Sequence, residues 1–473
     1  MFALLSPPHS QWQPQVGEFV ASIRAPRTII ILVKAGAPVD ATIEVLKPHL
    51  EVRARNHPAH HSSADSGSPH THAPNTLPPV TQPGDLIIDG GNEWYPNTVR
   101  RSKALADTGI HYMGMGVSGG EEGARHGPSL MPGGPKQAYD MVSPILNSIA
   151  AQTDDGACVT WIGESGSGNY VKMVHNGIEY GDMQLLAEAY DLLKRVVGLS
   201  NAELADVFAA YNTSELESFL VEITADIFRV PNPHGEGQLI DYVLDKTGMK
   251  GTGKWTVQEA AERSVPAATI AAALDARYLS GLKAERQAAS RVLPGPDLSA
   301  IPQPDRAQLV EDVKHALYCA KVCSYAQGMA LIRAAAQELE WTVNLGECAR
   351  IWKGGCIIRA KLLDRIKAAY ERSPDLANLL VDPDFAQSIA DRQTAWRRVV
   401  ALAVGSGVPV PAMSGSLAYY DAYRTARLPA SLTQAQRDYF GAHTFERTDR
   451  DGSHHVEWAA LAEAAGDGAS AKK

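Results

Sequence analysis

A continuous run of apolar, mostly β-branched residues at positions 28–33 (TIIILV) constrains the fold of this chain more than any other segment. Such a run is typical of a strand buried on both faces of a parallel sheet. Residues 40–50 predict a short helix, and residues 85–89 (DLIID) predict a second buried strand that ends at Gly90 and Gly91. Strand, helix and strand in this order predict an α/β domain with a parallel sheet.

Long helical patterns replace the strands from Tyr170 onward. Ala and Leu recur at helical spacing, which predicts a large, mainly α-helical domain. The segments are 185–197, 202–211, 267–282 and 307–338. The chain after Gly441 is rich in Ala and Gly, and we expect a tail that packs weakly without a partner. We predict an α/β domain at 1–165, an all-helical domain at 166–425 and a C-terminal tail at 426–473.

A polar segment, residues 51–83, separates the two predicted strands. It is rich in His, Ser, Pro and Asn, which favours a disordered insertion. Clustered histidines can bind a metal, but none of these lies on a predicted rigid element, so we expect a solvated linker and no metal site. The histidines are His57, His60, His61, His70 and His72.

Charge, cysteines and hydropathy narrow the classes of partner. A formal net charge of −9 repels polyphosphate backbones, so we expect no nucleic-acid partner. The five cysteines lie scattered without a CxxC pair, which argues against a disulfide framework and a zinc site. No window approaches the roughly 18 apolar residues of a membrane span, and the first residues lack the pattern of a signal peptide. We therefore expect a cytoplasmic protein without a membrane partner.

The glycine-rich segment 114–119 (GMGVSG) fits the dinucleotide pattern GxGxxG and follows a plausible strand at residues 110–113. Glu121 and Glu122, however, would place two negative charges where a pyrophosphate must meet a helix. Pro128 and the nearby glycines argue against a regular helix after the motif. We therefore expect a loop that binds something other than a pyrophosphate.

Two further glycine-rich segments resemble phosphate-binding motifs. Residues 248–254 (GMKGTGK) fit most of a P-loop, but Trp255 stands where Ser or Thr must bind magnesium. Residues 163–168 (GESGSG) open a helix without the full spacing, which favours a tight turn between domains. Neither segment predicts nucleotide hydrolysis.

The segment after this turn carries a polar stripe at helical spacing. Lys172, His175, Asn176 and Glu179 fall at i, i+3, i+4 and i+7, so their side chains share one face of a predicted helix. Spacing alone favours a solvated face with an ordinary lysine–glutamate pair. Gly177 changes this balance, because glycine inside a helix costs about 1 kcal/mol relative to alanine and indicates the close approach of a ligand or a backbone.

This helix and seven further segments resemble the 6-phosphogluconate dehydrogenase family. VKMVHNGIEYGDMQL resembles the family's catalytic helix, and the matches extend from about Pro26 to His443. The others are VKAG (33–36), IIDGGN (87–92), GVSGGEEGARHGPS (116–129), GMKGTGKWT (248–256), LKAER (282–286), GGCIIRAKLL (354–363) and QAQRDYFGAHTFE (434–446). The resemblance implies a Rossmann-like domain, a helical substrate and dimerisation domain, and NADP-dependent oxidative decarboxylation of 6-phosphogluconate to ribulose 5-phosphate and CO₂, without a metal.

The resemblance also implies roles for the polar stripe. Lys172 resembles the general base that takes the proton of the substrate's C3 hydroxyl, and Glu179 resembles the acid that protonates C1 of the enediol. Asn176 resembles the amide that holds substrate hydroxyls, and His175 is expected to help lower the pKa of Lys172. A free lysine has a pKa of about 10.4, whereas a base at neutral pH needs roughly 7 to 8, and the acid needs a raised pKa.

Other matched positions are expected to bind the substrate. Arginine suits its phosphate through a bidentate fork, and a tail that reaches into the neighbouring subunit implies a homodimer. The loop near the substrate carboxylate is expected to be Ser118, Gly119 and Gly120. The expected phosphate ligands are Tyr180, Lys250, Thr252 and Arg277, with Arg437 and His443 from the neighbouring subunit's tail.

The N-terminal part departs from the family pattern. Only 27 residues precede Thr28, without a periodic apolar run, whereas a βαβ unit needs roughly 30 residues. We therefore expect an incomplete Rossmann-like sheet that lacks the N-terminal part of its dinucleotide-binding domain, with Lys34, Ala35 and Asn92 as the remaining cofactor contacts. Asn169 also stands where the family pattern has histidine.

Three functions remain open on the sequence. One is an active NADP-dependent enzyme whose start lies upstream, and another is a non-catalytic homologue or truncated product that keeps the substrate and dimer domain. Keeping Lys172, Asn176 and Glu179 together favours the enzyme. The third is a dehydrogenase of a small unphosphorylated acid, which would leave Lys250, Arg277 and the tail cations without an anionic partner.

Overall fold

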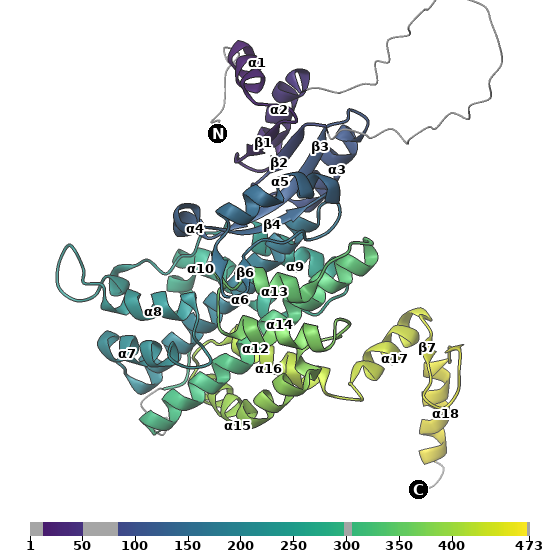
Figure 1. Cartoon of the computed structure of the whole chain (residues 1–473). Coiled ribbons are helices and arrows are strands. Elements are labelled where there is room, and N and C mark those ends of the chain that lie inside the picture. The colour runs from purple at the N-terminus through teal and green to yellow at the C-terminus, as the bar shows by residue number, and fades with distance from the viewer. Residues whose placement is uncertain (1–12, 51–83, 298–304, 471–473) are drawn as a thin grey trace, which may run out of the picture. The chain divides into compact units, whose positions relative to one another are not determined.

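The computed structural model describes residues 13–50, 84–297 and 305–470, so the predicted insertion at 51–83 and its histidines lie outside the described residues. The chain divides into two compact units, Met1–Leu417 and Ala418–Lys473. The first unit contains a sheet followed by a large set of helices (Figure 1). The division into three domains at 165 and 425 stays a prediction.

A four-stranded sheet in the order β1-β2-β3-β4 forms the first part of the chain. β1, β2 and β3 are parallel, and β4 runs antiparallel to β3. The strands are β1 (Thr28–Ile31), β2 (Leu86–Asp89), β3 (His111–Ser118) and β4 (Ser129–Gly133). The predicted parallel α/β sheet is confirmed, with β1 and β2 slightly shorter than predicted because their last or first predicted residues do not pair.

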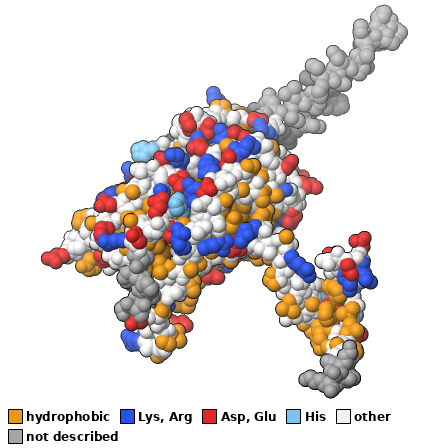
Figure 2. Space-filling view, turned by 90° about the horizontal axis from the view of Figure 1, so that it is seen from below, with side chains coloured by type: hydrophobic (Ala, Val, Ile, Leu, Met, Phe, Trp, Pro, Cys, Tyr) orange, Lys and Arg blue, Asp and Glu red, His pale blue; other side chains and the backbone are white. Residues whose placement is uncertain are grey.

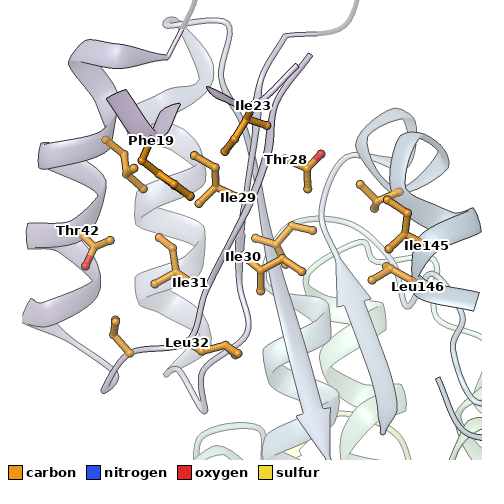
Figure 3. Close-up of a pocket in the computed structure, with 14 residues that line it drawn as sticks. Phe19, Ile23, Thr28, Ile29, Ile30, Ile31, Leu32, Thr42, Ile145 and Leu146 are labelled. Carbon is orange, nitrogen blue, oxygen red and sulfur yellow. The ribbon is translucent and has the colours of Figure 1, made fainter. Parts of the chain in front are cut away.

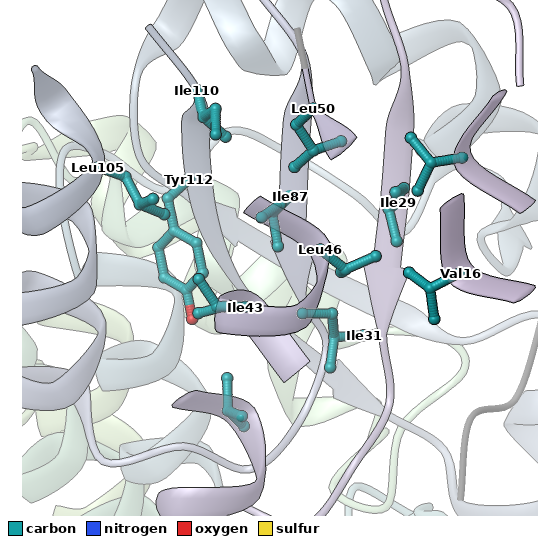
Figure 4. Packing of buried hydrophobic residues seen from close by; sticks show 12 residues of the cluster. Val16, Ile29, Ile31, Ile43, Leu46, Leu50, Ile87, Leu105, Ile110 and Tyr112 are labelled. Carbon is teal, nitrogen blue, oxygen red and sulfur yellow. The ribbon is translucent and has the colours of Figure 1, made fainter. Parts of the chain in front are cut away.

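Helices cover both faces of this sheet. Successive side chains of a strand point to opposite faces, so a single strand contributes apolar residues to two cores. Ile87 packs on one side with residues of α1, α2 and α3, and Figure 4 shows this core. Leu86 and Ile88 pack on the other side against α5. The covering elements are α1 (Gln13–Ser22), α2 (Ala37–Leu46), η1 (Lys47–His49), α3 (Tyr95–Ala106) and α5 (Lys136–Ile149).

β1 is an edge of the sheet in the described part of the chain, where no strand pairs with its outer side. An apolar hollow of about 170 Å³ lies along it, with Ile30, Leu32 and Ile145 in its lining (Figure 3). Leu32 and Ile145 are each 52% exposed. The described part of the sheet therefore begins at β1.

The loop predicted at residues 114–119 is wrong, because residues 114–118 belong to β3 and only Gly119 lies beyond the end of this strand. A helix, α4 (Gly120–His126), then follows, which corrects the prediction that none would form. Glu121 and Glu122 lie in its first turn, where the helix dipole favours carboxylates. The helix ends at Gly127, whose φ of 118° suits glycine, so Pro128 lies beyond it.

A large set of helices follows the sheet and confirms the predicted helical domain. α6 and α12 are the longest of these helices, and most of their residues are buried. The elements are α6 (Ser167–Leu192), η2 (Leu193–Val197), α7 (Asn201–Tyr211), α8 (Phe219–Arg229), η3 (Leu239–Tyr242), α9 (Thr252–Glu262), α10 (Ala268–Gly281), α11 (Lys283–Ala289), α12 (Arg306–Glu338), α13 (Leu345–Ile351), α14 (Leu362–Arg372), η5 (Leu379–Val381), α15 (Pro383–Gly405) and α16 (Pro411–Tyr423). None of the helices in the described ranges has the length and apolarity needed to cross a membrane.

Glycines allow α6 to lie directly against the sheet. An added Cβ at Gly116 of β3 would lie 2.3 Å from Cβ of Lys172, and one at Gly133 of β4 would lie 2.2 Å from the backbone N of Gly168. Real Cβ atoms do not approach so closely, so any side chain there would push α6 away. The glycines of the GMGVSG segment thus place Lys172 at the end of β3.

The C-terminal unit contains α17 (Ala430–Gly441), a hairpin of β7 (Phe445–Glu446) and β8 (Ser453–His454), and α18 (Trp458–Ser470). Buried Asp438 links these elements, since it accepts hydrogen bonds from the backbone of Thr444, from His455 and from the Trp458 indole. Burial alone would raise the pKa of Asp438, but these donors lower it to about 2. The predicted tail therefore has its own folded structure.

Candidate active site

The carboxyl ends of β1, β2 and β3 open onto a cavity of about 1400 Å³ that α6, α9 and α10 close from the other side. Ligands of open parallel sheets bind outside the carboxyl ends of the strands. The structure brings most of the predicted site residues to this one cavity. They are Asn92, Ser118, Gly119, Gly120, Lys172, Asn176, Glu179, Tyr180, Lys250, Thr252 and Arg277.

Five predicted site residues do not line this cavity. His175 is fully buried behind it, and Lys34 and Ala35 lie in the turn after β1, outside the lining. Arg437 and His443 belong to the C-terminal unit. The roles predicted for these residues therefore need separate tests.

Lys172 projects from the first turns of α6 and is 6% exposed. Burial lowers its pKa to about 8, although the nearby Glu179 and Cys356 oppose this shift. Its Nζ lies 3.5 Å from Nδ1 of His175. An amine with this pKa is partly neutral near pH 8 and can accept a proton from a substrate hydroxyl.

His175 is a buried, neutral support rather than a second base. Burial, together with the charge of Lys172, lowers its pKa well below the usual value. Nδ1 lies 3.0 Å from the amide oxygen of Asn176, which can only accept, so Nδ1 carries the proton. Nε2 then accepts from the Ser118 hydroxyl at 3.2 Å. Burial lowers the pKa of Lys172, and buried His175 lies beside its amine, so the contribution expected of this histidine stays a prediction.

Glu179 lies on the same face of α6, two turns after Lys172. Burial raises its pKa, with the charges of Lys172 and Arg277 acting in the opposite direction. Between them, Asn176 donates a hydrogen bond from Nδ2 to Oγ1 of Thr252 on α9, at 3.0 Å. One helix face therefore presents an amine with a lowered pKa, an oriented amide and a carboxyl group with a raised pKa.

The far end of the cavity is suited to an anion. The Arg277 guanidinium stacks 3.4 Å from the centroid of the Tyr180 ring and donates to the Gly248 carbonyl at 3.2 Å. Lys250 precedes Thr252, the first residue of α9. Helix N-termini attract anions, and arginine and lysine add positive charge. The GMKGTGK segment thus contributes to an anion site through a helix start, although it is not a P-loop.

Gly177 faces a neighbouring helix rather than a ligand. An added Cβ would lie 2.5 Å from Cγ2 of Thr256 on α9. This close approach also brings Thr252 within reach of Asn176. The sequence correctly indicated a close contact at Gly177, but only the packing identifies its partner.

Several cavity residues were not predicted from the sequence. Arg125 and His126 from α4, Met183 from α6 and Ile357 line the cavity. Arg125 and His126 stand within the GEEGARHG match, which was a usable signal, whereas nothing in the local sequence marks Met183 or Ile357. The apolar residues Leu32, Met115 and Val117 extend the lining toward β1.

No group of three or more His, Cys, Asp and Glu residues in the described ranges could hold a metal ion. All five cysteines are free and buried.

Two family models match this chain. The model described as the C-terminal domain of 6-phosphogluconate dehydrogenase matches residues 168–458. The model described as the NAD binding domain of 6-phosphogluconate dehydrogenase matches residues 66–163. The boundary between the two matches falls at the start of α6, where the sheet meets the helices.

Curated relatives are similar over nearly the whole chain. The chloroplastic decarboxylating 6-phosphogluconate dehydrogenase 1 of Arabidopsis thaliana is 60% identical, and the match covers 96% of this chain and 88% of the relative. The decarboxylating 6-phosphogluconate dehydrogenase of Synechococcus elongatus is 58% identical over 93% of this chain and 87% of the relative. Such coverage does not support the prediction that the N-terminal part of the dinucleotide-binding domain is lacking.

One solved structure is similar in both sequence and fold. It is the Plasmodium falciparum 6-phosphogluconate dehydrogenase, with a TM-score of 0.84 and 44% identity. The match covers 94% of this chain and 88% of that chain. That enzyme is described in its apo form, with its cofactor NADP⁺ and with its substrate 6-phosphogluconate.

Proposed function

This chain belongs to the 6-phosphogluconate dehydrogenase family, and on that premise we propose that it oxidises and decarboxylates 6-phospho-D-gluconate to D-ribulose 5-phosphate and CO₂, with reduction of NADP. The observation that carries the proposal is the arrangement of one cavity. Lys172, Asn176 and Glu179 lie on one helix face, and Lys250 and Arg277 provide the positive end.

Lys172 starts the reaction as the neutral amine. It takes the proton of the C3 hydroxyl as C3 is oxidised, and NADP, when bound, would supply the acceptor for the hydride from C3. The resulting ammonium donates a hydrogen bond to the new ketone oxygen, which stabilises the negative charge that develops there as CO₂ leaves. The lowered pKa of Lys172 suits this exchange, because the group must hold a proton and release it within one turnover.

Glu179 completes the reaction by protonating the enediol at C1. The carboxyl must carry a proton when the enediol forms, and its raised pKa favours that state. Asn176 holds substrate hydroxyls between the base and the acid. His175 fixes the amide of Asn176 and the hydroxyl of Ser118, so its role is to position the groups that contact substrate.

The anion end supports a phosphorylated substrate. Lys250, Arg277 and the start of α9 offer positive charge and hydrogen-bond donors at one place. A small unphosphorylated acid would leave these groups without a partner. Assays with NADP and either 6-phosphogluconate or 3-hydroxyisobutyrate separate the two functions. We expect turnover of the first compound only, and turnover of the second alone would overturn the assignment.

A homodimer follows from the same premise, with Arg437 and His443 binding the phosphate in the neighbouring subunit's site. Exposed apolar side chains support an interface between copies. Tyr242, Val243 and Leu244 are each 60% or more exposed, and on the C-terminal unit Leu432, Tyr439 and Phe440 are 59% or more exposed. Figure 2 shows apolar side chains gathered on this unit.

The cofactor site and the cellular location need their own tests. Titration with NADPH, followed by its fluorescence, decides between the enzyme and a non-catalytic homologue. We expect saturable binding. We also propose a cytoplasmic location. Related plant proteins are named chloroplastic, so cell fractionation is needed to test this location.

A further inference from the structure

A buried group of charges lies beneath the carboxyl ends of β1 and β2 and joins the two turns that follow these strands. Its centre is Arg101 of α3, whose side chain is 2% exposed. The guanidinium donates to Oε2 of Glu93 at 2.6 Å and to the Gly36 carbonyl at 2.9 Å. Its Nε donates to Oδ1 of Asp40 at 2.8 Å. The planar fork of arginine reaches these partners at once, which lysine cannot do.

Glu93 is the second member of this group, and its side chain is 1% exposed. Besides the bond from Arg101, it accepts from the backbone N–H of Gly36 at 2.8 Å and of Trp94 at 2.7 Å. Nδ2 of Asn97 donates to it at 3.0 Å. Glu93 therefore ties the turn after β1 to the start of α3.

The two turns also touch each other directly. The backbone N–H of Gly90 donates to the Ile31 carbonyl at 2.9 Å, and an added Cβ at Gly91 would lie 3.2 Å from the Val33 carbonyl. Leu32 in the first turn and Asn92 in the second line the large cavity. The position of this part of the cavity wall therefore depends on the bonds made by Arg101 and Glu93.

The same bonds leave neither residue available to bind a ligand. Gly36 is the N-cap of α2, and its backbone N–H already donates to Glu93. Asp40 places a second carboxylate in the first turn of this helix. A cofactor phosphate would be repelled there. The guanidinium of Arg101 donates its hydrogen bonds to protein acceptors. Arg101 therefore affects cofactor binding by holding other residues in place and not by contacting the cofactor.

We propose that Arg101 and Glu93 are positioning residues for the nicotinamide cofactor, because they hold the turns that carry Leu32 and Asn92 in place at the edge of the cavity. This inference rests on the proposed function. It assigns the pair to the cofactor end of the site, because the hydrogen bonds of Arg101 and Glu93 go to the turns after β1 and β2 and to α2 and α3, and none goes to the described residues of α6 or α9.

Glu93→Gln tests the inference, because glutamine keeps the size but turns an amide donor toward groups that are themselves donors. We expect the KM for NADP to rise about tenfold or more, as for the loss of a hydrogen bond to a charged group. The KM for 6-phosphogluconate should change less than about twofold. Arg101→Lys should give the same pattern, and hydrogen exchange at the Gly36 amide should become faster in both variants.

The neighbouring residue Arg100 provides a matched control. It lies on the same helix, is 56% exposed and pairs with Asp40 at 2.8 Å, and exposed pairs contribute little. Arg100→Gln should therefore leave both KM values and the exchange at Gly36 unchanged. If Glu93→Gln does not fold, Asn97→Ala removes a single bond to Glu93 and should raise the KM for NADP about threefold.

The outcomes separate this inference from the proposed function. No turnover of 6-phosphogluconate by the unmodified chain would contradict the function and the inference with it. Normal turnover with an unchanged KM for NADP in Glu93→Gln and Arg101→Lys would overturn the inference alone. Equal increases in both KM values would show a general structural role and would overturn it as well.

Discussion

In the proposed mechanism, Lys172 and Glu179 start the reaction in protonation states that are uncommon for their residue types. Burial lowers the pKa of the amine to about 8 and raises the pKa of the carboxyl group. A single physical cause therefore acts in opposite directions on a base and an acid, because desolvation always disfavours the charged form. If either side chain moved into solvent, its pKa would return toward the ordinary value for its residue type, and it would lose the protonation state that the mechanism requires.

Lys172→Met is expected to abolish turnover. Methionine keeps the length and apolar body of the side chain but cannot take a proton, so kcat should fall by about 10³-fold or more. Binding of 6-phosphogluconate, measured by calorimetry, should stay nearly intact, because the proposed phosphate ligands Lys250 and Arg277 are unchanged in this variant. Lys136→Met, at an exposed lysine paired with Asp140, is the control. A near-normal kcat in Lys172→Met would remove this residue from the mechanism.

The pH dependence of kcat/KM follows from the same lysine. Only the neutral amine is a base, so protonation as the pH falls through about 8 should lower kcat/KM. Well below that value the decrease should approach tenfold per pH unit. Initial rates at low 6-phosphogluconate concentration measure this limb. A kcat/KM that stays constant as the medium is acidified would show that Lys172 is not the base.

At this scale the sequence predicted much of the site. The spacing of Lys172, Asn176 and Glu179 placed them on one helix face, and the cavity contains all three. The tautomer and support role of His175 could not be predicted, because they depend on Ser118 in a distant strand. Glu93 and Arg101 could not be predicted either, because they bind backbone groups of a turn that is distant in the sequence.

α6 is the element on which the site depends, and glycines determine where it lies. Gly116 and Gly133 let the sheet approach its first turns, and Gly177 lets α9 approach its middle. The sequence predicted the helix but interpreted the GMGVSG glycines as a ligand loop. A local pattern cannot distinguish a glycine that meets a ligand from one that meets a helix. Only the tertiary packing decides.

Gly177→Ala should destabilise the protein and weaken substrate binding. The new methyl group would overlap Thr256 and push α9 away, so we expect a loss of about 1–3 kcal/mol in the free energy of unfolding. The hydrogen bond between Asn176 and Thr252 would lengthen, which should raise the KM for 6-phosphogluconate. Denaturant unfolding and initial rates measure both effects.

A second glycine gives the matched control. An added Cβ at Gly405 of α15 meets no atom within 4 Å, so Gly405→Ala should leave stability unchanged or raise it slightly. Equal stability in Gly177→Ala and Gly405→Ala would show that α9 does not constrain Gly177. Thr256→Ser, which removes the closest carbon, should partly restore Gly177→Ala.

The whole molecule is expected to work as a homodimer whose C-terminal units complete the partner's phosphate sites. Arg437→Ala and Lys172→Met should each be inactive or strongly impaired, yet their coexpression should restore activity. In a mixed dimer one site combines an intact Lys172 with an intact Arg437. Random pairing gives about a quarter of normal activity by this symmetry argument. Activity no higher than that of the separate variants would exclude a shared site.

The stoichiometry of the reaction catalysed by the purified chain is the sharpest test of the proposed mechanism. Lys172 as base and Glu179 as acid require oxidation and decarboxylation of the same substrate molecule. We predict that 6-phosphogluconate and NADP yield NADPH and CO₂ in equal amounts, followed by absorbance and by trapping of labelled CO₂ from C1. NADPH without CO₂, or no NADPH at all under conditions where the chain is folded, would contradict the account.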